Sequence, residues 1–349
     1  MKVLFLPSST NGLGAVDRRR FLAFQSAEKS FSFTFNPKEQ YDLIFCAGSG
    51  DINLAIKLRE SGKPLIYDYA NHYLVEDNFY KNIFRPIYFS LHKRHKYCFR
   101  SFKNSIIRII KNSDAVVCSS QQQKIYIKSN LNYHNTTVLT DFFEFDFPFL
   151  FRKKNILKIE NKNALFWEGQ AENLINFKSI NKTIFEKERI NLVTDLSYRD
   201  GLLRKSTKLY CDRIFKNYNL LNWNQSNVTY LSQKSDIAII PIDTDIPIYY
   251  AKPENKVILM FLLGLPVITS SIPSYQNILC QTGISNLLIT QERCWGDAIH
   301  DLRMMSLKNQ VELKLDLRDF ALKNYSTSSL KTRWKTLFEK VISANSVST

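Results

Sequence analysis

The sequence predicts an α/β protein built from doubly wound parallel sheets, and three observations support this. Short apolar runs alternate with longer helix-like segments along most of the 349 residues, which is the pattern of βαβ units. The alternation pauses once, in the phenylalanine-rich stretch 140–155, and then resumes. The length also exceeds what one core usually fills, since a domain takes roughly 100–200 residues. We therefore expect two consecutive α/β domains of similar size.

The first half carries continuous apolar runs that are typical of buried parallel strands. Helix-like segments separate them, the last of which is unusually long. The expected strands are residues 2–6, 41–47, 64–69 and 114–120, and the expected helical segments are 17–30, 51–63 and about 80–111.

The second half also alternates apolar runs with helix-like segments. An amphipathic segment at 328–343 predicts a closing helix. The expected strands here are residues 164–169, 190–195, 228–232, 236–242 and 266–271.

Composition points to an anionic partner. The net charge is +16, which suits nucleic acid, anionic lipid headgroups or a phosphorylated substrate. A basic, soluble protein without such a partner is the alternative. The six cysteines are scattered without a CxxC pair, so neither a zinc site nor a disulfide framework is predicted. The apolar run at the N-terminus is too short for a signal peptide, and the run 257–268 is too short to span a bilayer, which takes roughly 20 residues. We expect a cytoplasmic protein, with peripheral attachment to the inner face of the membrane.

The stretch 81–111 is the natural place for such attachment. It holds nine Lys and Arg residues, no Asp or Glu, and interleaved aromatic and aliphatic side chains. This mixture suits a helix lying on an anionic membrane surface. A solvated helix face is the alternative. Nucleic acid is a less favoured partner, because no RNP-like strand, zinc finger or recognition helix accompanies the charge.

Ligands of open parallel sheets bind beyond the carboxyl ends of strands, so the residues of a site are expected in the loops that follow the strands. In the loop after the first strand, Gly12 and Gly14 permit close backbone approach, and the following helix offers amides to an anion. The spacing is not the dinucleotide fingerprint GxGxxG, since Asp17 occupies the last position. An ordinary turn remains the alternative.

A second loop carries a carboxylate and an imidazole four positions apart, Asp68 and His72. Together they could orient or deprotonate a hydroxyl group, so both are catalytic candidates. A structural histidine is the alternative.

A third loop precedes the apolar helix that ends at Gly264-Leu265-Pro266. Pro253 suits the first turn of that helix, which places charged residues at an exposed helix start. Lysines there could hold a diphosphate, and neighbouring oxygens could accept hydrogen bonds from sugar hydroxyls. Simple helix capping is the alternative. The residues concerned are Lys252, Glu254, Asn255 and Lys256.

With these residues in view, the segment 236–269 resembles the donor-binding segment of GT-B glycosyltransferases, especially those related to family 4. Looser similarity covers 113–127, 163–177 and 324–341. The resemblance implies two Rossmann-like domains facing a central cleft. It gives residues 1–145 as an acceptor domain, 146–325 as a nucleotide-sugar domain, and 326–349 as a helix returning to the first domain.

The resemblance also implies the chemistry. A nucleotide-sugar donor would bind the second domain, where Gly169 and Asn173 follow the first strand, and a surface-glycan or lipid-linked acceptor would bind the first. No metal or cofactor is expected, because protein cations and helix dipoles neutralise the leaving diphosphate. One departure is that Ala251 and Leu259 stand where family 4 usually has two glutamates. This departure keeps a non-catalytic protein that binds an anionic glycan, lipid or nucleic acid as an alternative. A sugar-nucleotide epimerase of similar two-domain shape is another.

Overall fold

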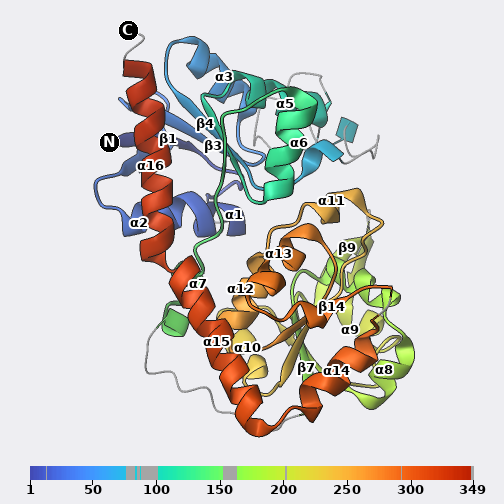
Figure 1. Ribbon diagram of the computed structural model, residues 1–349. Coiled ribbons are helices and arrows are strands. Elements are labelled where there is room, and N and C mark those ends of the chain that lie inside the picture. The colour runs from blue at the N-terminus through green and yellow to red at the C-terminus, as the bar shows by residue number, and fades with distance from the viewer. Residues whose placement is uncertain are drawn as a thin grey trace. The chain divides into compact units, whose positions relative to one another are not determined.

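The computed structural model describes residues 1–12, 14–75, 83–84, 87, 101–151, 163–200, 203–291 and 293–346. The chain divides into two compact units (Figure 1). The first contains Met1–Phe145, Tyr250–Pro253 and Tyr325–Thr349, and the second contains Asp146–Tyr249 and Glu254–Asn324.

The first unit is built on a six-stranded sheet whose neighbouring strands all run parallel, in the order β2-β1-β3-β4-β5-β6. The four strands expected from the sequence are all present, which confirms the predicted α/β fold of this half. Two short strands, β2 and β6, were not predicted because each has only three residues. The strands are β1 Lys2–Leu6, β2 Ser32–Thr34, β3 Leu43–Ala47, β4 Leu65–Tyr69, β5 Ala115–Cys118 and β6 Thr136–Val138.

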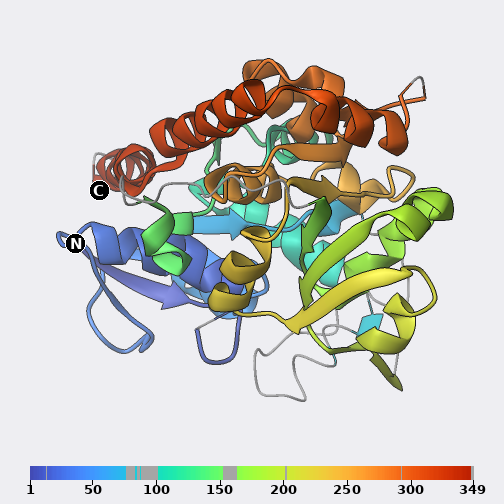
Figure 2. The ribbon, with the colours of Figure 1, turned by 90° about the horizontal axis from the view of Figure 1, so that it is seen from below.

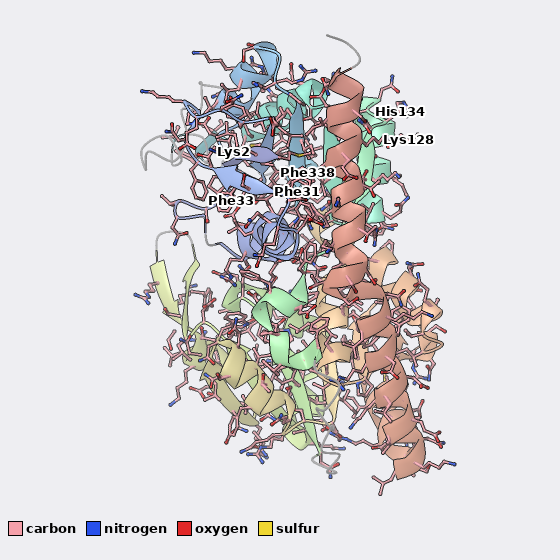
Figure 3. The ribbon with its side chains drawn as sticks, turned by 90° about the vertical axis from the view of Figure 1, so that its left-hand side faces the viewer. Lys2, Phe31, Phe33, Lys128, His134 and Phe338 are labelled. Atoms are coloured by element: carbon pink, nitrogen blue, oxygen red, sulfur yellow. The ribbon has the colours of Figure 1, made fainter. Side chains whose placement is uncertain are left out.

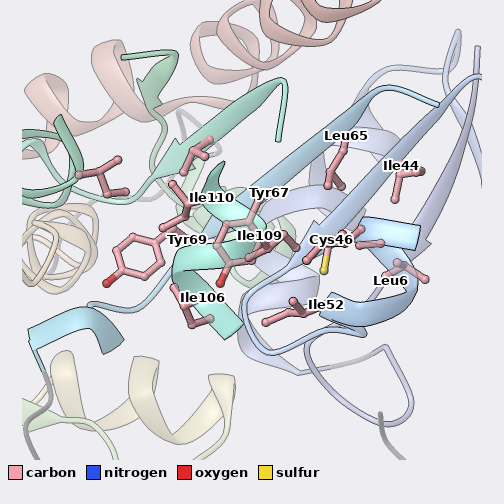
Figure 4. Close-up of a cluster of buried hydrophobic side chains, with 14 of the residues drawn as sticks. Leu6, Ile44, Cys46, Ile52, Leu65, Tyr67, Tyr69, Ile106, Ile109 and Ile110 are labelled. Carbon is pink, nitrogen blue, oxygen red and sulfur yellow. The ribbon is translucent and has the colours of Figure 1, made fainter. Parts of the chain in front are cut away.

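Helices cover both faces of this sheet, because alternate side chains of each strand point to opposite faces. Leu4 and Leu6 of β1 pack in one core cluster, with residues of helices α3 (Ile52–Glu60) and α5 (Phe102–Asn112) (Figure 4). Val3 and Phe5 pack in the other, with α2 (Ala23–Ala27) and α16 (Thr327–Ser346). Figure 2 shows the same helices and strands from below, in the colours of Figure 1. The remaining helices of this unit are α1 Ala15–Asp17, the π-helix η1 Arg18–Leu22, η2 Tyr73–Val75 and α6 Gln121–Leu131, and α7 Phe143–Asp146 spans the boundary between the units.

Helix α5 corrects part of the predicted membrane-facing segment. Its apolar residues Ile106, Ile109 and Ile110 are fully buried in the first core cluster, so they are not available to a lipid surface. The rest of the segment, 81–100, lies outside the described residues except for 83, 84 and 87.

Many aromatic side chains pack in the core cluster on the other face of the first sheet, which α2 and α16 cover. Phe338 of α16 lies 5.4 Å from Phe31 and 5.2 Å from Phe24, measured between ring centroids (Figure 3). Trp334, one turn earlier, is fully buried and stacks on Phe24. The closing helix therefore completes the core of the first unit.

The second unit has a six-stranded parallel sheet in the order β11-β8-β7-β12-β13-β14 and a separate antiparallel hairpin, β9–β10. The observed α/β architecture thus confirms the predicted fold class in both halves. The strands are β7 Ala164–Glu168, β8 Arg189–Thr194, β9 Ser197–Asp200, β10 Leu203–Ser206, β11 Asn217–Asn222, β12 Ile237–Ile240, β13 Val267–Ser270 and β14 Leu288–Ile289.

One expected strand is wrong. Residues 228–232 belong to helix α10 (Gln225–Ser232), whose first turn is capped by the side chain of Asn224 accepting from the amide of Asn227. Val228 and Leu231, three positions apart, face the core. The other helices are η3 Pro148–Phe151, η4 Ala171–Ser179, α8 Lys182–Lys187, α9 Thr207–Cys211, α11 Pro247–Tyr250, α12 Asn255–Leu262, α13 Pro273–Gln281, η5 Ser285–Leu287, α14 Trp295–Met304 and α15 Leu307–Tyr325.

Candidate functional site

The strand order of the second unit marks its candidate site. From β7 the chain moves outward to β8 and β11, and then crosses back to β12 on the other side of β7. The space beyond the carboxyl ends of β7 and β12 is therefore a topological switch point, the place where open parallel sheets bind ligands. Gly169 follows β7 directly.

Lys256 brings a positive charge to this point. It lies in the first turn of α12, and its Nζ donates a hydrogen bond of 2.7 Å to the main-chain oxygen of Glu168. The ammonium also lies 4.9 Å from the centroid of the Trp167 ring, within the range of a cation–π contact. Burial lowers the pKa of Lys256, while the charge of Glu168 opposes that shift. Since this is its one hydrogen bond to the described residues, two N–H groups remain to donate to an anion.

Gly169 makes the position of Lys256 possible. Its φ is +154°, and a Cβ atom at this residue would collide with Lys256 Nζ and press on the Trp167 ring. Gly169 and Lys256, both of which the sequence predicts in the donor site, are thus brought into direct contact.

Other polar groups lie near the side chain of Glu168. The side chain of Glu168 is buried, and its Oε2 accepts a hydrogen bond of 3.1 Å from Trp223 Nε1. Tyr275 of α13 is fully buried; burial raises its pKa, and the charges of Glu254 and Glu168 raise it further. Both carboxylates therefore lie near one phenol at the base of α12.

The start of α12 differs from the prediction. The helix begins at Asn255 with Glu254 as its N-cap, so Pro253 is not in its first turn. Lys252 and Pro253 group with the first unit, where Ser120 Oγ donates to the main-chain oxygen of Ala251. Of the four donor residues expected at this helix start, Glu254, Asn255 and Lys256 belong to the second unit and Lys252 to the first.

Asn255 carries an open acceptor. Its Oδ1 is buried and has no hydrogen-bond partner among the residues that the structure describes. A buried acceptor left unpaired costs about 1–3 kcal/mol. It would be satisfied by a ligand hydroxyl.

Asn173 lies in η4, where its main-chain oxygen accepts from Asn176 Nδ2 at 2.8 Å. Asn176 itself was not predicted as a site residue. Its Oδ1 accepts from the amide of Asp243 at 3.0 Å, which ties the loop after β7 to the loop after β12. Both loops flank the switch point, but no sequence pattern distinguishes this buried asparagine from its neighbours.

In the first unit, Asp17 organises the loop that holds Gly12 and Gly14. Its carboxylate accepts from the amides of Ser8 and Ser9 and from Ser9 Oγ, at 2.6–2.9 Å. The amide of Gly14 donates to Ser9 Oγ at 2.8 Å, and a Cβ at Gly14 would press on Ser9. The glycines thus close a tight loop, and their role in ligand binding stays a prediction.

Asp68 is fully buried and forms a two-point ion pair. Arg20 Nε and Nη2 donate to its two oxygens at 2.7 and 2.8 Å. Nη1 of Arg20 donates to the main-chain oxygen of Leu139 and to Asp141 at 2.9 and 3.1 Å. Burial opposes the charge of Arg20, but the two carboxylates raise its pKa overall.

His72 belongs to a different network. Its Nδ1 lies 3.2 Å from the hydroxyl of Tyr69, and this hydroxyl accepts from the amide of Leu74 at 2.9 Å. The Tyr69 proton is then free to point at Nδ1, which leaves the imidazole neutral. Burial lowers the pKa of His72 to about 4. The structure gives Asp68 and His72 separate partners, so a joint catalytic role stays a prediction.

The part of the chain that the structure describes contains no group of three or more His, Cys, Asp or Glu side chains placed to hold a metal ion. None of the described helices has the length and apolar character needed to cross a bilayer.

No protein-family profile and no curated protein sequence matches the chain. Several solved structures match the chain at low identity. Anabaena HepE in complex with UDP-glucose has a TM-score of 0.60 at 14% identity, covering 98% of this chain and 100% of HepE. WaaG, a glycosyltransferase involved in lipopolysaccharide biosynthesis, has a TM-score of 0.55 at 12% identity, and the match covers 95% of this chain and 98% of WaaG. TarM has a TM-score of 0.56 at 14% identity, and the match covers 91% of this chain but only 57% of the TarM chain. The chain therefore has the GT-B fold, as expected from the sequence.

Proposed function

We propose that this protein is a glycosyltransferase that moves a sugar from a nucleotide-sugar donor to a surface-glycan or lipid-linked acceptor. The observation that carries the proposal is the ammonium of Lys256, held at the switch point of the second sheet by Glu168 and by the space at Gly169. HepE, which shares the fold, was solved with UDP-glucose. An anion with a diphosphate is the ligand that this fold and this charge suit together.

In this proposal Lys256 neutralises the diphosphate as it departs, and it acts with fixed geometry because its contacts already order it. Asn255 Oδ1 accepts a hydrogen bond from a hydroxyl of the donor, which removes the cost of its missing partner. Glu254 is a second acceptor at the same helix start. No metal or cofactor is required, and the chain works at the cytoplasmic side of a membrane.

The test measures UDP and UDP-glucose binding by calorimetry for the wild type and for Lys256→Met. The variant removes the charge and keeps the apolar stem. Loss of a charged hydrogen bond of about 1.5–3 kcal/mol predicts a Kd for UDP that is roughly 10- to 150-fold higher. Lys182→Met is the matched control, because Lys182 is exposed on α8 of the same unit. Equal UDP affinity in all three proteins would contradict the proposal.

A second function is favoured by one observation. Ala251 and Leu259, which stand where the resembling family has glutamates, are 1% and 2% exposed, so neither offers an acceptor to a sugar. A non-catalytic protein that binds an anionic ligand would fit. Release of UDP from UDP-glucose in the presence of membrane-extracted glycolipids separates the two functions. Conversion of the donor with no acceptor present would instead indicate an epimerase.

A further inference from the structure

The second unit contains a hollow of about 790 Å³ that is separate from the contacts of Lys256. Residues of η4, of the β9–β10 hairpin and of α9 line it. Its volume lies within the roughly 300–1,000 Å³ of small-molecule sites. We call it the hairpin pocket.

The hairpin pocket is strongly basic. Four cations line it against one carboxylate, Glu172. Arg204 Nε donates to Ser197 Oγ at 2.8 Å, which holds its guanidinium on the hairpin without neutralising it. Within the described ranges, neither Lys178 nor Arg213 pairs with a carboxylate, and both are exposed. Such a concentration of one sign raises the local concentration of anions. The cations are Lys178, Arg204, Lys205 and Arg213.

Aromatic and aliphatic groups accompany this charge. The rings of Tyr198 and Tyr210 meet edge to face, with centroids 6.4 Å apart and planes at 86°. The hydroxyl of Tyr210 donates to the main-chain oxygen of Leu174 at 3.4 Å, which orients its ring. Leu209 and Ile175, also on the lining, are 62% and 40% exposed. The ligand must therefore combine negative charge with apolar faces, as a pyranose ring bearing acidic substituents does.

The pocket lies on the same edge of the sheet as Lys256. Helix η4 begins at Ala171, two residues after Gly169, and β9 begins three residues after the end of β8. A hollow suits an oligosaccharide chain better than a planar bilayer. We infer that the hairpin pocket binds an anionic oligosaccharide. On the proposed function, this would be a negatively charged part of the acceptor glycan that the second unit binds, in addition to the acceptor contacts expected of the first unit.

The test titrates the full chain with a heparin-derived hexasaccharide, with neutral maltohexaose, with phosphatidylglycerol vesicles and with a single-stranded oligodeoxynucleotide. The pocket variant is Lys178→Glu with Arg213→Glu. The control is Lys182→Glu with Lys187→Glu, which makes the same charge change on exposed residues of α8. We expect hexasaccharide affinity to fall roughly tenfold or more in the pocket variant and to stay near the wild-type value in the control. We expect neutral maltohexaose to bind neither the wild type nor either double variant.

Three results would overturn the inference: no hexasaccharide binding by the wild type, equal loss in both double variants, or tighter binding of vesicles or oligodeoxynucleotide than of hexasaccharide. UDP titrations on the same proteins keep the proposals apart. An unchanged Kd for UDP shows that the pocket variant is folded, so the loss of hexasaccharide then belongs to the pocket. A wild type that binds hexasaccharide but no UDP contradicts the proposed transferase and leaves the pocket assignment intact.

Discussion

Lys256 Nζ occupies the space that a Cβ atom at residue 169 would need. Because Gly169 has no side chain, the Lys256 ammonium can approach the main-chain oxygen of Glu168 and donate to it at 2.7 Å. Because the two residues are in direct contact, their coupling is testable by a double-mutant cycle.

The first prediction concerns Gly169→Ala. The added methyl group displaces Lys256 and strains a backbone with φ of +154°, so we expect UDP affinity to fall and the free energy of unfolding to drop by roughly 1–3 kcal/mol. In a Lys256→Ala background the collision is gone, and the same substitution should cost less stability while UDP binding stays weak. Calorimetry and urea unfolding measure both quantities. Equal costs in the two backgrounds would show that the residues are not coupled.

The second prediction separates structure from catalysis at Asp68. Both of its oxygens accept hydrogen bonds from the buried Arg20, and breaking such a pair leaves a charge without its partner. We expect Asp68→Asn to lower the free energy of unfolding by about 3–5 kcal/mol. Asp141→Asn is the control and should cost less, because Asp141 makes one bond to Arg20 and its side chain is 15% exposed. A stable Asp68→Asn protein without turnover would instead support the catalytic role.

Much of the fold could be predicted because buried parallel strands are unbroken apolar runs. All five residues of β3, Leu43–Ala47, are buried. The same logic missed β11, Asn217–Asn222, which lies at the edge of its sheet and is exposed at both ends and half-buried between them. It also misread 228–232, where β-branched and aromatic residues suggested a strand but the Asn224 cap starts a helix.

The site could be predicted only in part. The sequence predicts both Gly169 and Lys256 as donor-site residues. It does not predict their contact, because 88 positions separate Lys256 from its partner Glu168. The hairpin pocket was missed, since its cations are spread from Lys178 to Arg213 with no motif among them. Asp68 is a catalytic candidate because it precedes His72 by four positions just after a buried strand. Its ion pair with Arg20 is not predicted, because Arg20 lies 48 positions earlier.

The third prediction concerns the closing helix. Trp334 is fully buried, stacks on Phe24 and lies 5.4 Å from the guanidinium of Arg20. Trp334→Ala should lower the free energy of unfolding by about 3–5 kcal/mol. Hydrogen exchange should then rise in β1 and β3 of the first unit and stay low in β7 and β8 of the second. Lys340→Ala, at an exposed position of the same helix, should change neither. Equal loss of protection in both units would contradict a role confined to the first.

The fourth prediction is a pH dependence that His72 controls. Burial lowers its pKa to about 4 from an ordinary value of 6.5. As the pH falls below 6.5, the unfolded chain therefore takes up a proton that the folded protein refuses, and stability is lost progressively until about pH 4. A difference of this size corresponds to at most about 3 kcal/mol. His72→Asn keeps an oxygen able to accept from Tyr69 and cannot be protonated in this range. Urea midpoints for the two proteins from pH 7 down to pH 4.5 test this, because acidic residues titrate in both and cancel in the difference. The wild type should lose more stability than the variant on acidification, and parallel curves would mean that His72 is solvated rather than buried.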